Sequence, residues 1–512
     1  MIGVRPDAFS QGYVLPHPQP APERPRHAPP SESADPILFW NEVCLDLVSL
    51  DHSIDAKDAR APGPCASARA LGLAHIAMAD AAAAVYPAGY EGLYVRGVHI
   101  PNMDFPGVFV GAATAWMLEQ IYSTPIHTHF IGMQRMRFLK HHGQQALNAW
   151  NAGLAFARNQ AFTSRWDWPS IKSAALDSSS RATIQTRGLH DVDPFNPDQK
   201  FYGVNWGRVT PLTPGLSVGA LGPADPPSEF DRRYQEDLED VRNHGVFRTQ
   251  GATVEQVQQG LFWAYDGPRL IGTPPRLYNQ IVRQVAAQDG MSAPELARTF
   301  ALCNLAMADA AIVCWEAKYR YRVWRPVIGV PRALHNPDPN WRPYGAPRTN
   351  PMLFSLGRDS QYALPAQSLL GGGQYVMQQR EITQNALPYQ RAAFTPNFPA
   401  YPSGHSTFGS TCFNILKFIR AERAPTAGDP GRIDSPHPFV SDELNGIAID
   451  NFTNAPRPYW PIQYTRLEKM IEDNNRSRVH LGVHWHFDCE QGDVSGARCA
   501  AVIYRTAYRR FR

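Results

Sequence analysis

Apolar residues recur at helical spacing along most of the chain. The segments with this spacing are about residues 36–50, 66–86, 108–123, 138–163, 252–264, 275–289, 293–322, 405–421, 463–475 and 488–509. Strand-like alternation is scarce, so the pattern predicts an all-α protein. Two irregular stretches, about 164–250 and 327–400, are crowded with Pro, Gly, Asn and Asp. Loops of that length in a compact protein usually build or cover a site.

The hexapeptide Ala-Met-Ala-Asp-Ala-Ala occurs twice, at 77–82 and at 306–311, each time inside an alanine-rich helical segment. Such a repeat is typical of an ancient duplication. We therefore expect two packed, duplicated helical bundles with long irregular loops. In our division of the chain, residues 1–34 are a flexible Pro-rich leader, residues 35–250 an N-terminal bundle without the site, and residues 251–512 a C-terminal bundle that carries it.

Composition narrows the classes of protein. The 512 residues are 43% hydrophobic and 19% charged, as in soluble globular proteins, and the net charge of +3 is too small and dispersed to favour nucleic acid. Seven cysteines without a close pair argue against a disulfide framework or a cysteine metal site. We find neither a stretch of about 18 apolar residues nor a signal-peptide core. The expectation is a cytoplasmic protein that does not contact a membrane.

The helix that contains the second hexapeptide places a lysine on its buried side. A capping-box pattern at Ser292-Ala293-Pro294-Glu295 begins it, and its apolar stripe leads in steps of three or four residues to Lys318. A buried ammonium group is costly unless paired, so a negative partner should meet it. Pro326 biases Arg325 away from the helix, yet both cations can converge at the helix end. The alternative is that both side chains reach the surface.

A second segment, Pro402-Ser403-Gly404-His405, precedes another helical run. Ser403 is suited to cap that helix, Gly404 permits close approach of the backbone, and the free N–H groups make an anion site. His405 would serve there as an acid–base group. The alternative is an ordinary helix cap.

A third segment brings Ser477-Arg478, then His484, then Asp488. Arg478 can grip an oxyanion through two donors. His484 offers a metal ligand or a nucleophile, and Asp488 could orient its ring. We interpret His480 and His486 as packing or surface residues.

The three segments together predict an oxyanion site. They supply cations (Lys318, Arg325, Arg478), neutral donors (Ser403, Gly404) and imidazoles (His405, His484). An excess of donors suits a tetrahedral, multiply charged anion, whereas a divalent metal ion would require carboxylates. The expected guest is phosphate or an analogue of phosphate.

These segments, in this order and spacing, resemble the three-part signature shared by vanadium-dependent haloperoxidases and type 2 phosphatidic acid phosphatases. Segments 262–282, 314–326, 397–409 and 478–488 resemble vanadium chloroperoxidases in particular, and the resemblance covers about residues 255–500. It implies the all-α fold of the vanadium chloroperoxidase and acid phosphatase type.

The resemblance also implies a cofactor and a role for each residue. Vanadate would be held by Lys318, Arg325, Ser403, Gly404 and Arg478, with His484 as its single protein ligand to the metal. Catalytic roles fall to His405, which takes a proton from hydrogen peroxide, to Lys318, which polarises the peroxide, to His484, and to Asp266, the acidic partner of the cations. Trp315 and Phe398 would form the halide and substrate pocket, and Asp488 would orient His484.

The implied activity is oxidation of bromide, and of chloride as well, by hydrogen peroxide to a hypohalous-acid-like species that halogenates small organic substrates. Phosphate is expected to occupy the site when vanadate is absent, and a homodimer is one assembly open to the chain. Two alternatives remain at this stage. One is a phosphatase of the same superfamily with His484 as nucleophile, and the other is a vanadium-independent descendant that acts on a small molecule.

Overall fold

The computed structural model describes most of residues 35–510. The ranges outside the description are 1–34, 55–57, 88, 141, 159–161, 163, 177–185, 247–252, 348–392, 424–427, 435–436, 447, 449, 451–456 and 511–512. The expected Pro-rich leader lies outside the described residues, and so does most of the expected long loop over 327–400.

The described chain is almost entirely helical, which confirms the predicted all-α class. The helices of the first half are α1 (Pro36–Asp51), α2 (Gly63–Val85), α3 (Pro106–Ile121), α4 (Pro125–Lys140), α5 (Ala146–Ala157) and α7 (Trp168–Leu176). Those that follow are α8 (Arg232–His244), α9 (Val254–Phe262), α10 (Pro274–Gln288), α11 (Ala293–Tyr321), α12 (Pro326–Gly329), α14 (Gly404–Arg423), α15 (Leu467–His480) and α16 (His486–Thr506). Short 3-10 turns η2 (Trp206–Arg208), η3 (Gly219–Leu221) and η4 (Asp442–Leu444), and a two-strand ladder of β1 (Ala346–Pro347) with β2 (Ala393–Phe394), complete the described elements.

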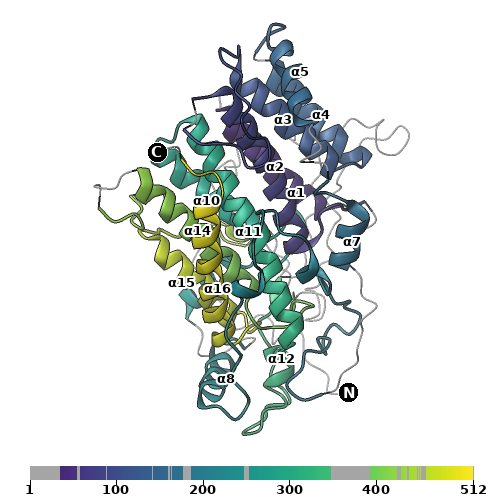
Figure 1. Ribbon diagram of the computed structural model, residues 1–512. Coiled ribbons are helices and arrows are strands. Elements are labelled where there is room, and N and C mark those ends of the chain that lie inside the picture. The colour runs from purple at the N-terminus through teal and green to yellow at the C-terminus, as the bar shows by residue number, and fades with distance from the viewer. Residues whose placement is uncertain are drawn as a thin grey trace.

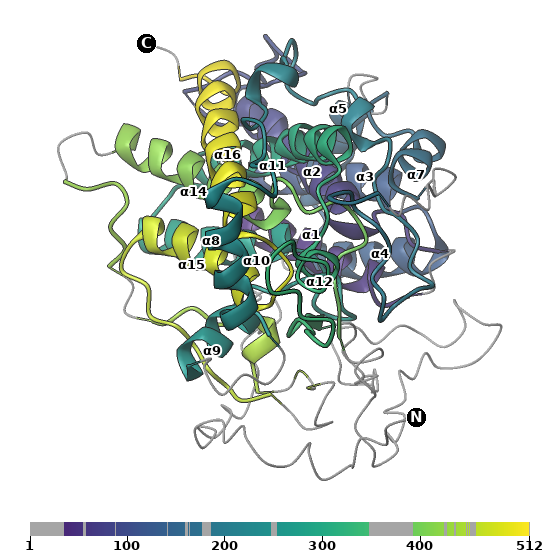
Figure 2. The same cartoon turned by 90° about the horizontal axis from the view of Figure 1, so that it is seen from below.

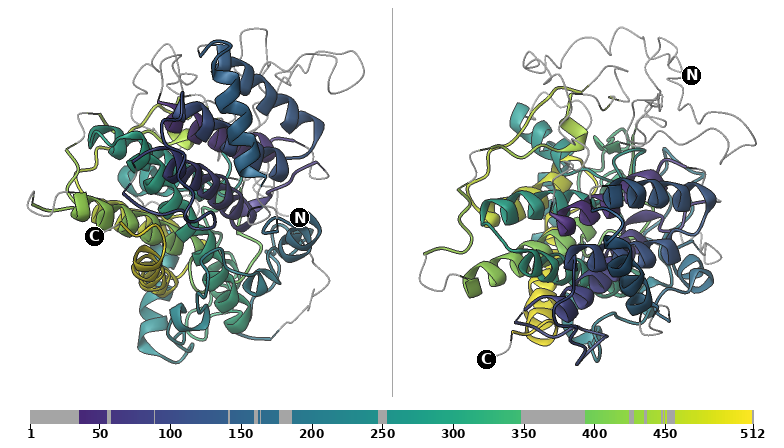
Figure 3. Two further views of the ribbon diagram at one scale, coloured as in Figure 1. Left: turned by 45° about the horizontal axis from the view of Figure 1, so that its top comes forward. Right: turned by 90° about the horizontal axis from the view of Figure 1, so that it is seen from above.

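Two helical groups lie side by side (Figures 1 and 2). In the N-terminal group α3 packs on α2 and α5, and in the C-terminal group α14 packs on α11 and α16. The two further views in Figure 3 keep the purple and blue helices together, apart from the green and yellow ones. Helix α8, although it falls in the segment assigned to the N-terminal bundle, packs on α15 and α16.

Helices α2 and α11, which carry the two hexapeptides, form the seam between the groups. Gly72 of α2 allows this close approach, because a Cβ atom there would lie 3.1 Å from the Ala308 Cβ atom. Both helices are long and apolar enough to cross a membrane by length and composition, a property that the sequence analysis missed. In their most apolar windows 94% and 100% of the residues are buried inside the protein, as in central core helices.

The repeated aspartates play the same structural part in each copy. Asp80 accepts backbone N–H bonds from Leu93, Tyr94 and Val95 at 2.7, 2.8 and 2.9 Å. Asp309 accepts them from Leu212 and Thr213 at 2.6 and 2.8 Å. Both carboxylates are fully buried, and each fixes a loop onto its helix. This correspondence supports the duplication inferred from the repeat.

The predicted helices differ from the observed ones where the apolar pattern is weak. Helix α8 presents only a narrow buried stripe of Tyr234, Leu238 and Val241, beside the buried carboxylate of Asp237, so apolar spacing does not predict it. The predicted run over 138–163 is in fact the end of α4 followed by α5, because Gly143 lies between them with φ of 72°.

Replacing either repeated aspartate should destabilise the fold. In Asp309→Ala two buried N–H groups lose their acceptor, and we expect a loss of about 2–4 kcal/mol in the free energy of unfolding. Asp80→Ala should cost at least as much, because three N–H groups are affected. Denaturant unfolding measures both, with Asp198→Ala at an exposed turn as the control. A loss below about 0.5 kcal/mol for both variants would contradict this role.

Candidate active site

The residues singled out from the sequence meet at one place in the C-terminal group. They come from the end of α11 (Trp315, Lys318) and the turn after it (Arg325), from the start of α14 and the segment before it (Phe398, Ser403, Gly404, His405), from the end of α15 (Arg478), from the turn into α16 and its first turn (His484, Asp488), and from the turn after α9 (Asp266). All are buried except Phe398 and Asp266, which are partly exposed. The convergence of the three sequence segments is therefore observed.

His484 is held in a single orientation. Its Nδ1 atom lies 2.9 Å from Asp488 Oδ2, which also accepts the Trp485 backbone N–H at 3.0 Å. Arg325 Nη1 donates to His484 Nε2 at 3.1 Å, so Nε2 carries the lone pair and Nδ1 carries the proton. Burial, helped by the neighbouring Arg325, lowers the pKa of His484 well below its ordinary value. The ring is thus neutral, and its lone pair accepts the Arg325 N–H.

The two arginines have more donors than partners. Arg325 donates Nε to Phe398 O at 2.9 Å and Nη1 to Val483 O at 2.7 Å, but its Nη2 has no acceptor in the described part of the chain. Arg478 uses Nη2 for both Asp266 oxygens, at 2.9 and 3.0 Å, while its Nε and Nη1 have no acceptor among the described residues. Buried guanidinium donors without acceptors are costly. Their chemistry fits a bound oxyanion such as vanadate or phosphate.

Lys318 contacts the segment before α14. Its ammonium group donates to the carbonyl oxygens of Pro399 and Ala400 at 2.8 and 2.9 Å, and also to that of Pro402. It lies 5.4 and 5.2 Å from the ring centroids of Trp315 and Phe398. Burial lowers the pKa of Lys318 to about 8. Because all three donors are engaged, direct contact with an oxyanion would require one of these bonds to be exchanged, and its role in binding the anion stays a prediction.

Helix α14 begins at Gly404, where a Cβ atom would lie only 3.2 Å from Trp315 Cη2. Ser403 donates its backbone N–H to Asp488 O at 2.8 Å, which ties this helix start to the third segment. Ser403 Oγ accepts the Ser406 N–H at 3.4 Å, the capping bond expected from the sequence. The first turn of α14 is therefore fixed beside the two arginines.

His405 is placed for proton transfer. Its Nε2 donates to Ala264 O at 2.6 Å and lies 4.0 Å from Asp266 Oδ1, so its other ring nitrogen is the acceptor. Burial, followed by the charge of Arg478, lowers the pKa of His405 well below its ordinary value. Burial also raises the pKa of Asp266, against the attraction of Arg478. A neutral base thus stands next to a carboxyl group that can stabilise its charged form.

A cavity of about 110 Å³ adjoins these groups: Gly404, His405, His484 and Asp266 line it, whereas Lys318, Arg325, Ser403 and Arg478 lie behind its wall and are not among its lining residues. His405, His484 and Asp266 supply its polar wall, and Trp315, Phe398 and Phe408 line its apolar side. One water needs roughly 10–15 Å³ of such volume, so the cavity has room for an oxyanion and small reactants.

The N-terminal half also contributes to this cavity, since Gly63, Pro64 and Tyr202 line it. The sequence motifs of the site lie only in the C-terminal half. Tyr202 lies in the irregular stretch 164–250, which was expected to build or cover a site, but no motif marked the residue itself. Its hydroxyl donates to Pro62 O at 2.8 Å, which fixes the ring at the start of α2.

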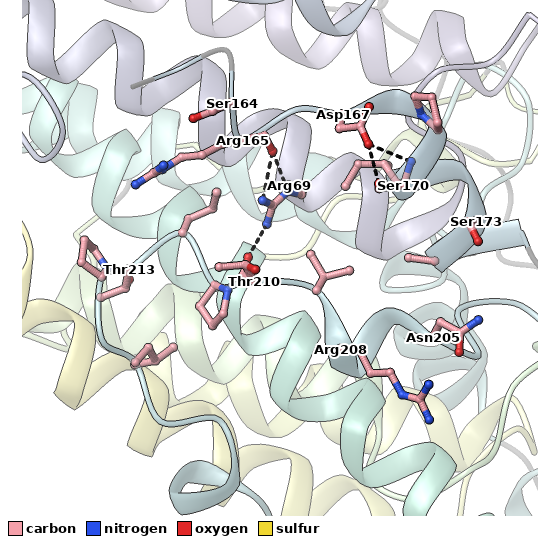
Figure 4. Close-up of a pocket in the computed structure, with 18 of the residues that line it drawn as sticks. Arg69, Ser164, Arg165, Asp167, Ser170, Ser173, Asn205, Arg208, Thr210 and Thr213 are labelled. Carbon is pink, nitrogen blue, oxygen red and sulfur yellow. Dashed lines mark hydrogen bonds between the residues drawn. The ribbon is translucent and has the colours of Figure 1, made fainter. Parts of the chain in front are cut away.

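A larger, open groove of about 1140 Å³ lies elsewhere, between α7 and the loop around η2 (Figure 4). Arg69 is occupied there with the carbonyl oxygens of Arg165 and Thr210 at 3.0 Å. Figure 4 shows the side chains of Arg165 and Arg208 on opposite sides of the groove. No histidine is among its lining residues, so the smaller cavity is the candidate active site despite its size.

Inorganic phosphate should stabilise the protein by filling this cavity. A ligand at 100 times its Kd raises the free energy of unfolding by about 2.7 kcal/mol, which increases the thermal midpoint. Arg478→Met should lose most of that increase, because two unpaired donors disappear. Arg476→Met is the matched control, since that guanidinium bonds Asp240 instead. An equal response to phosphate in Arg478→Met and wild type would contradict the assignment.

Comparisons with known proteins agree with this geometry. Residues 27–147 match the vanadium chloroperoxidase N-terminal domain, and residues 298–355 and 369–512 match the VCPO second helical-bundle domain. The vanadium chloroperoxidase of Curvularia inaequalis is 28% identical over 558 residues, which cover 93% of this chain and 82% of that protein.

Solved structures show the same fold. A bacterial vanadium-dependent iodoperoxidase aligns with a TM-score of 0.62 and 17% identity, covering 91% of this chain and 95% of that chain. The holo-type bacterial vanadium-dependent chloroperoxidase aligns with a TM-score of 0.58 and 13% identity, covering 90% of this chain and 95% of that chain. With both domain matches, the full-length relative and the shared fold, the chain belongs to the vanadium chloroperoxidase family.

Proposed function

We propose that this protein is a vanadate-dependent haloperoxidase. It oxidises bromide, and chloride as well, with hydrogen peroxide to a hypohalous-acid-like species that halogenates small organic substrates. One observation carries the proposal: the unpaired donors Arg325 Nη2 and Arg478 Nε and Nη1 lie near a neutral His484, whose Nε2 accepts only a 3.1 Å bond from Arg325 Nη1 that a metal could replace. The names of the relatives, which are vanadium haloperoxidases, support the choice of anion.

Vanadate would be held by Arg325 Nη2, by Arg478 Nε and Nη1, and by the start of α14, with His484 Nε2 as the ligand to the metal. When bound, it supplies a Lewis-acidic centre at which hydrogen peroxide becomes reactive toward halide. Asp488 keeps the His484 proton on Nδ1, so Nε2 carries the lone pair that would bind the metal once the Arg325 Nη1 bond to it is given up.

His405 acts as the base. Its ring is neutral near pH 7, and the bond from Nε2 to Ala264 O leaves the other nitrogen to accept a proton from hydrogen peroxide. Asp266, 4.0 Å away, stabilises the imidazolium that forms. Its bond to Arg478 keeps it in that position.

Trp315 and Phe398 form the proposed halide pocket. Their ring centroids lie 4.8 Å apart, and both rings line the cavity. Lys318 lies within 5.4 Å of both ring centroids, so a halide in this pocket is attracted to a positive charge while the rings exclude water.

A phosphatase is the second candidate. The bond between His484 and Asp488 would also orient a nucleophilic imidazole, and the same donors would bind a phosphoryl group. In the absence of vanadate we expect phosphate in this site.

Reconstitution with orthovanadate tests the proposal. Purified apoprotein given vanadate, hydrogen peroxide and bromide or chloride should halogenate a dye such as phenol red, and the rate should depend on vanadate. His484→Ala should reduce the rate at least about 100-fold, because it removes the single protein–metal bond. His486→Ala is the control, since its side chain does not line the cavity and lies near the surface, 3.8 Å from Asp240 and 3.4 Å from Glu490.

Two results would remove the proposal. One is the lack of halogenation with either halide in vanadate-loaded protein, and the other is full activity without vanadate. Hydrolysis of p-nitrophenyl phosphate under the first result would favour the phosphatase.

A further inference from the structure

Residues 393–402 form a strip that connects the cavity wall to the buried cations. Phe394, Pro396, Asn397 and Phe398 line the cavity. Directly after them, the carbonyl oxygens of residues 398–400 and 402 accept the donors of Arg325 and Lys318. A displacement of the strip would therefore move both the wall and the cations.

The first part of the strip is attached to a loop of the N-terminal half, residues 193–202. Asp193 Oδ2 accepts the backbone N–H of Thr395 at 3.0 Å and its hydroxyl at 3.2 Å. Gln199 donates its side-chain amide to Thr395 O at 3.1 Å. Further along, the Tyr202 N–H donates to Asn397 O at 3.0 Å. The two segments, which are nearly 200 residues apart in the chain, are thus joined by a ladder of polar contacts.

Asp193 is the charged member of this ladder. It is 4% exposed, and its other oxygen accepts the Phe195 N–H at 2.8 Å, which fixes the loop on its own side. The Asn196 side chain donates to Oδ2 at 3.0 Å. Hydrogen bonds to an ionised acceptor are stronger than those between neutral groups, so this carboxylate is the main attachment of the strip.

We propose that Asp193 is a positioning residue for the active site. It holds Thr395, and through the strip it holds the Phe398 carbonyl that accepts Arg325 Nε. By this path the N-terminal half, which lacks the anion-binding residues, sets the position of a guanidinium group that faces the anion. The inference rests on the proposed function only for the use of orthovanadate as a probe.

Hydrogen–deuterium exchange of the full chain tests the attachment. In Asp193→Ala, peptides that cover 393–402 should exchange about tenfold faster, because two bonds to Thr395 are lost. Peptides from α2 and α11 should be unchanged. Asp193→Asn should lie between the two, since its amide oxygen can still accept the Thr395 N–H.

Asp191→Ala is the matched control. Its carboxylate accepts the neighbouring Val192 N–H at 2.7 Å, within the same loop. Should Asp193→Ala fail to fold, Thr395→Val provides a milder test, because it removes only the hydroxyl bond. It should increase exchange across 393–402 by about threefold.

Calorimetric titration with orthovanadate tests the consequence for the site. The Kd should rise about tenfold in Asp193→Ala, less in Asp193→Asn, and not at all in Asp191→Ala. Unchanged exchange in 393–402, faster exchange throughout the protein, or faster exchange with an unchanged Kd would each overturn the inference. If wild type does not bind orthovanadate, the proposed function fails, and the exchange data alone decide whether Asp193 positions the strip.

Discussion

The site depends on buried positive charge that its own carboxylates, Asp266 and Asp488, offset only in part. Lys318, Arg325 and Arg478 are each 0% exposed. Of these three side chains, only Arg478 forms an ion pair with a described residue, Asp266. Carbonyl oxygens satisfy Lys318 and part of Arg325. Buried cations lower the stability of the protein when no anion is bound, and they bind an anion favourably, since charges interact strongly in a site that excludes water.

The fold tolerates this charge by enclosing it between helix ends. Lys318 lies in the last turn of α11, where the partial negative charge of the helix terminus favours a cation. Lys318 also bonds the carbonyl of Pro402, just before α14, and the N–H groups at the start of that helix favour an anion. Helix α11 packs on α2, so the seam between the two helical groups supports the helix that carries Lys318.

Much of this arrangement could be predicted from the sequence, and for a local reason. The apolar periodicity of α2, α11 and α14 and the capping box at Ser292 are properties of short segments. The charged residues of the site likewise fall into three short segments whose side-chain chemistry already indicates an oxyanion. Their convergence also follows from the family resemblance, which the comparisons extend to residues 27–147, where the repeated hexapeptide at 77–82 is the motif that the sequence offers.

What could not be predicted depends on contacts between distant segments. The sequence around Asp193 and Tyr202 shows neither periodicity nor a motif. Their contacts could not be predicted from it, because their partners, Thr395 and Pro62, lie far away in the chain. The carbonyl partners of Lys318 belong to backbone groups, which carry no sequence signal. Helix α8 escaped prediction because most of its side chains are charged and its buried stripe is narrow.

A crystal structure of the protein grown with orthovanadate tests the central claim most directly. The account predicts vanadium bonded to His484 Nε2, with its oxygens within hydrogen-bond distance of Arg325 Nη2 and of Arg478 Nε and Nη1. Vanadate bound at another place, with these three donors still lacking acceptors, would contradict it.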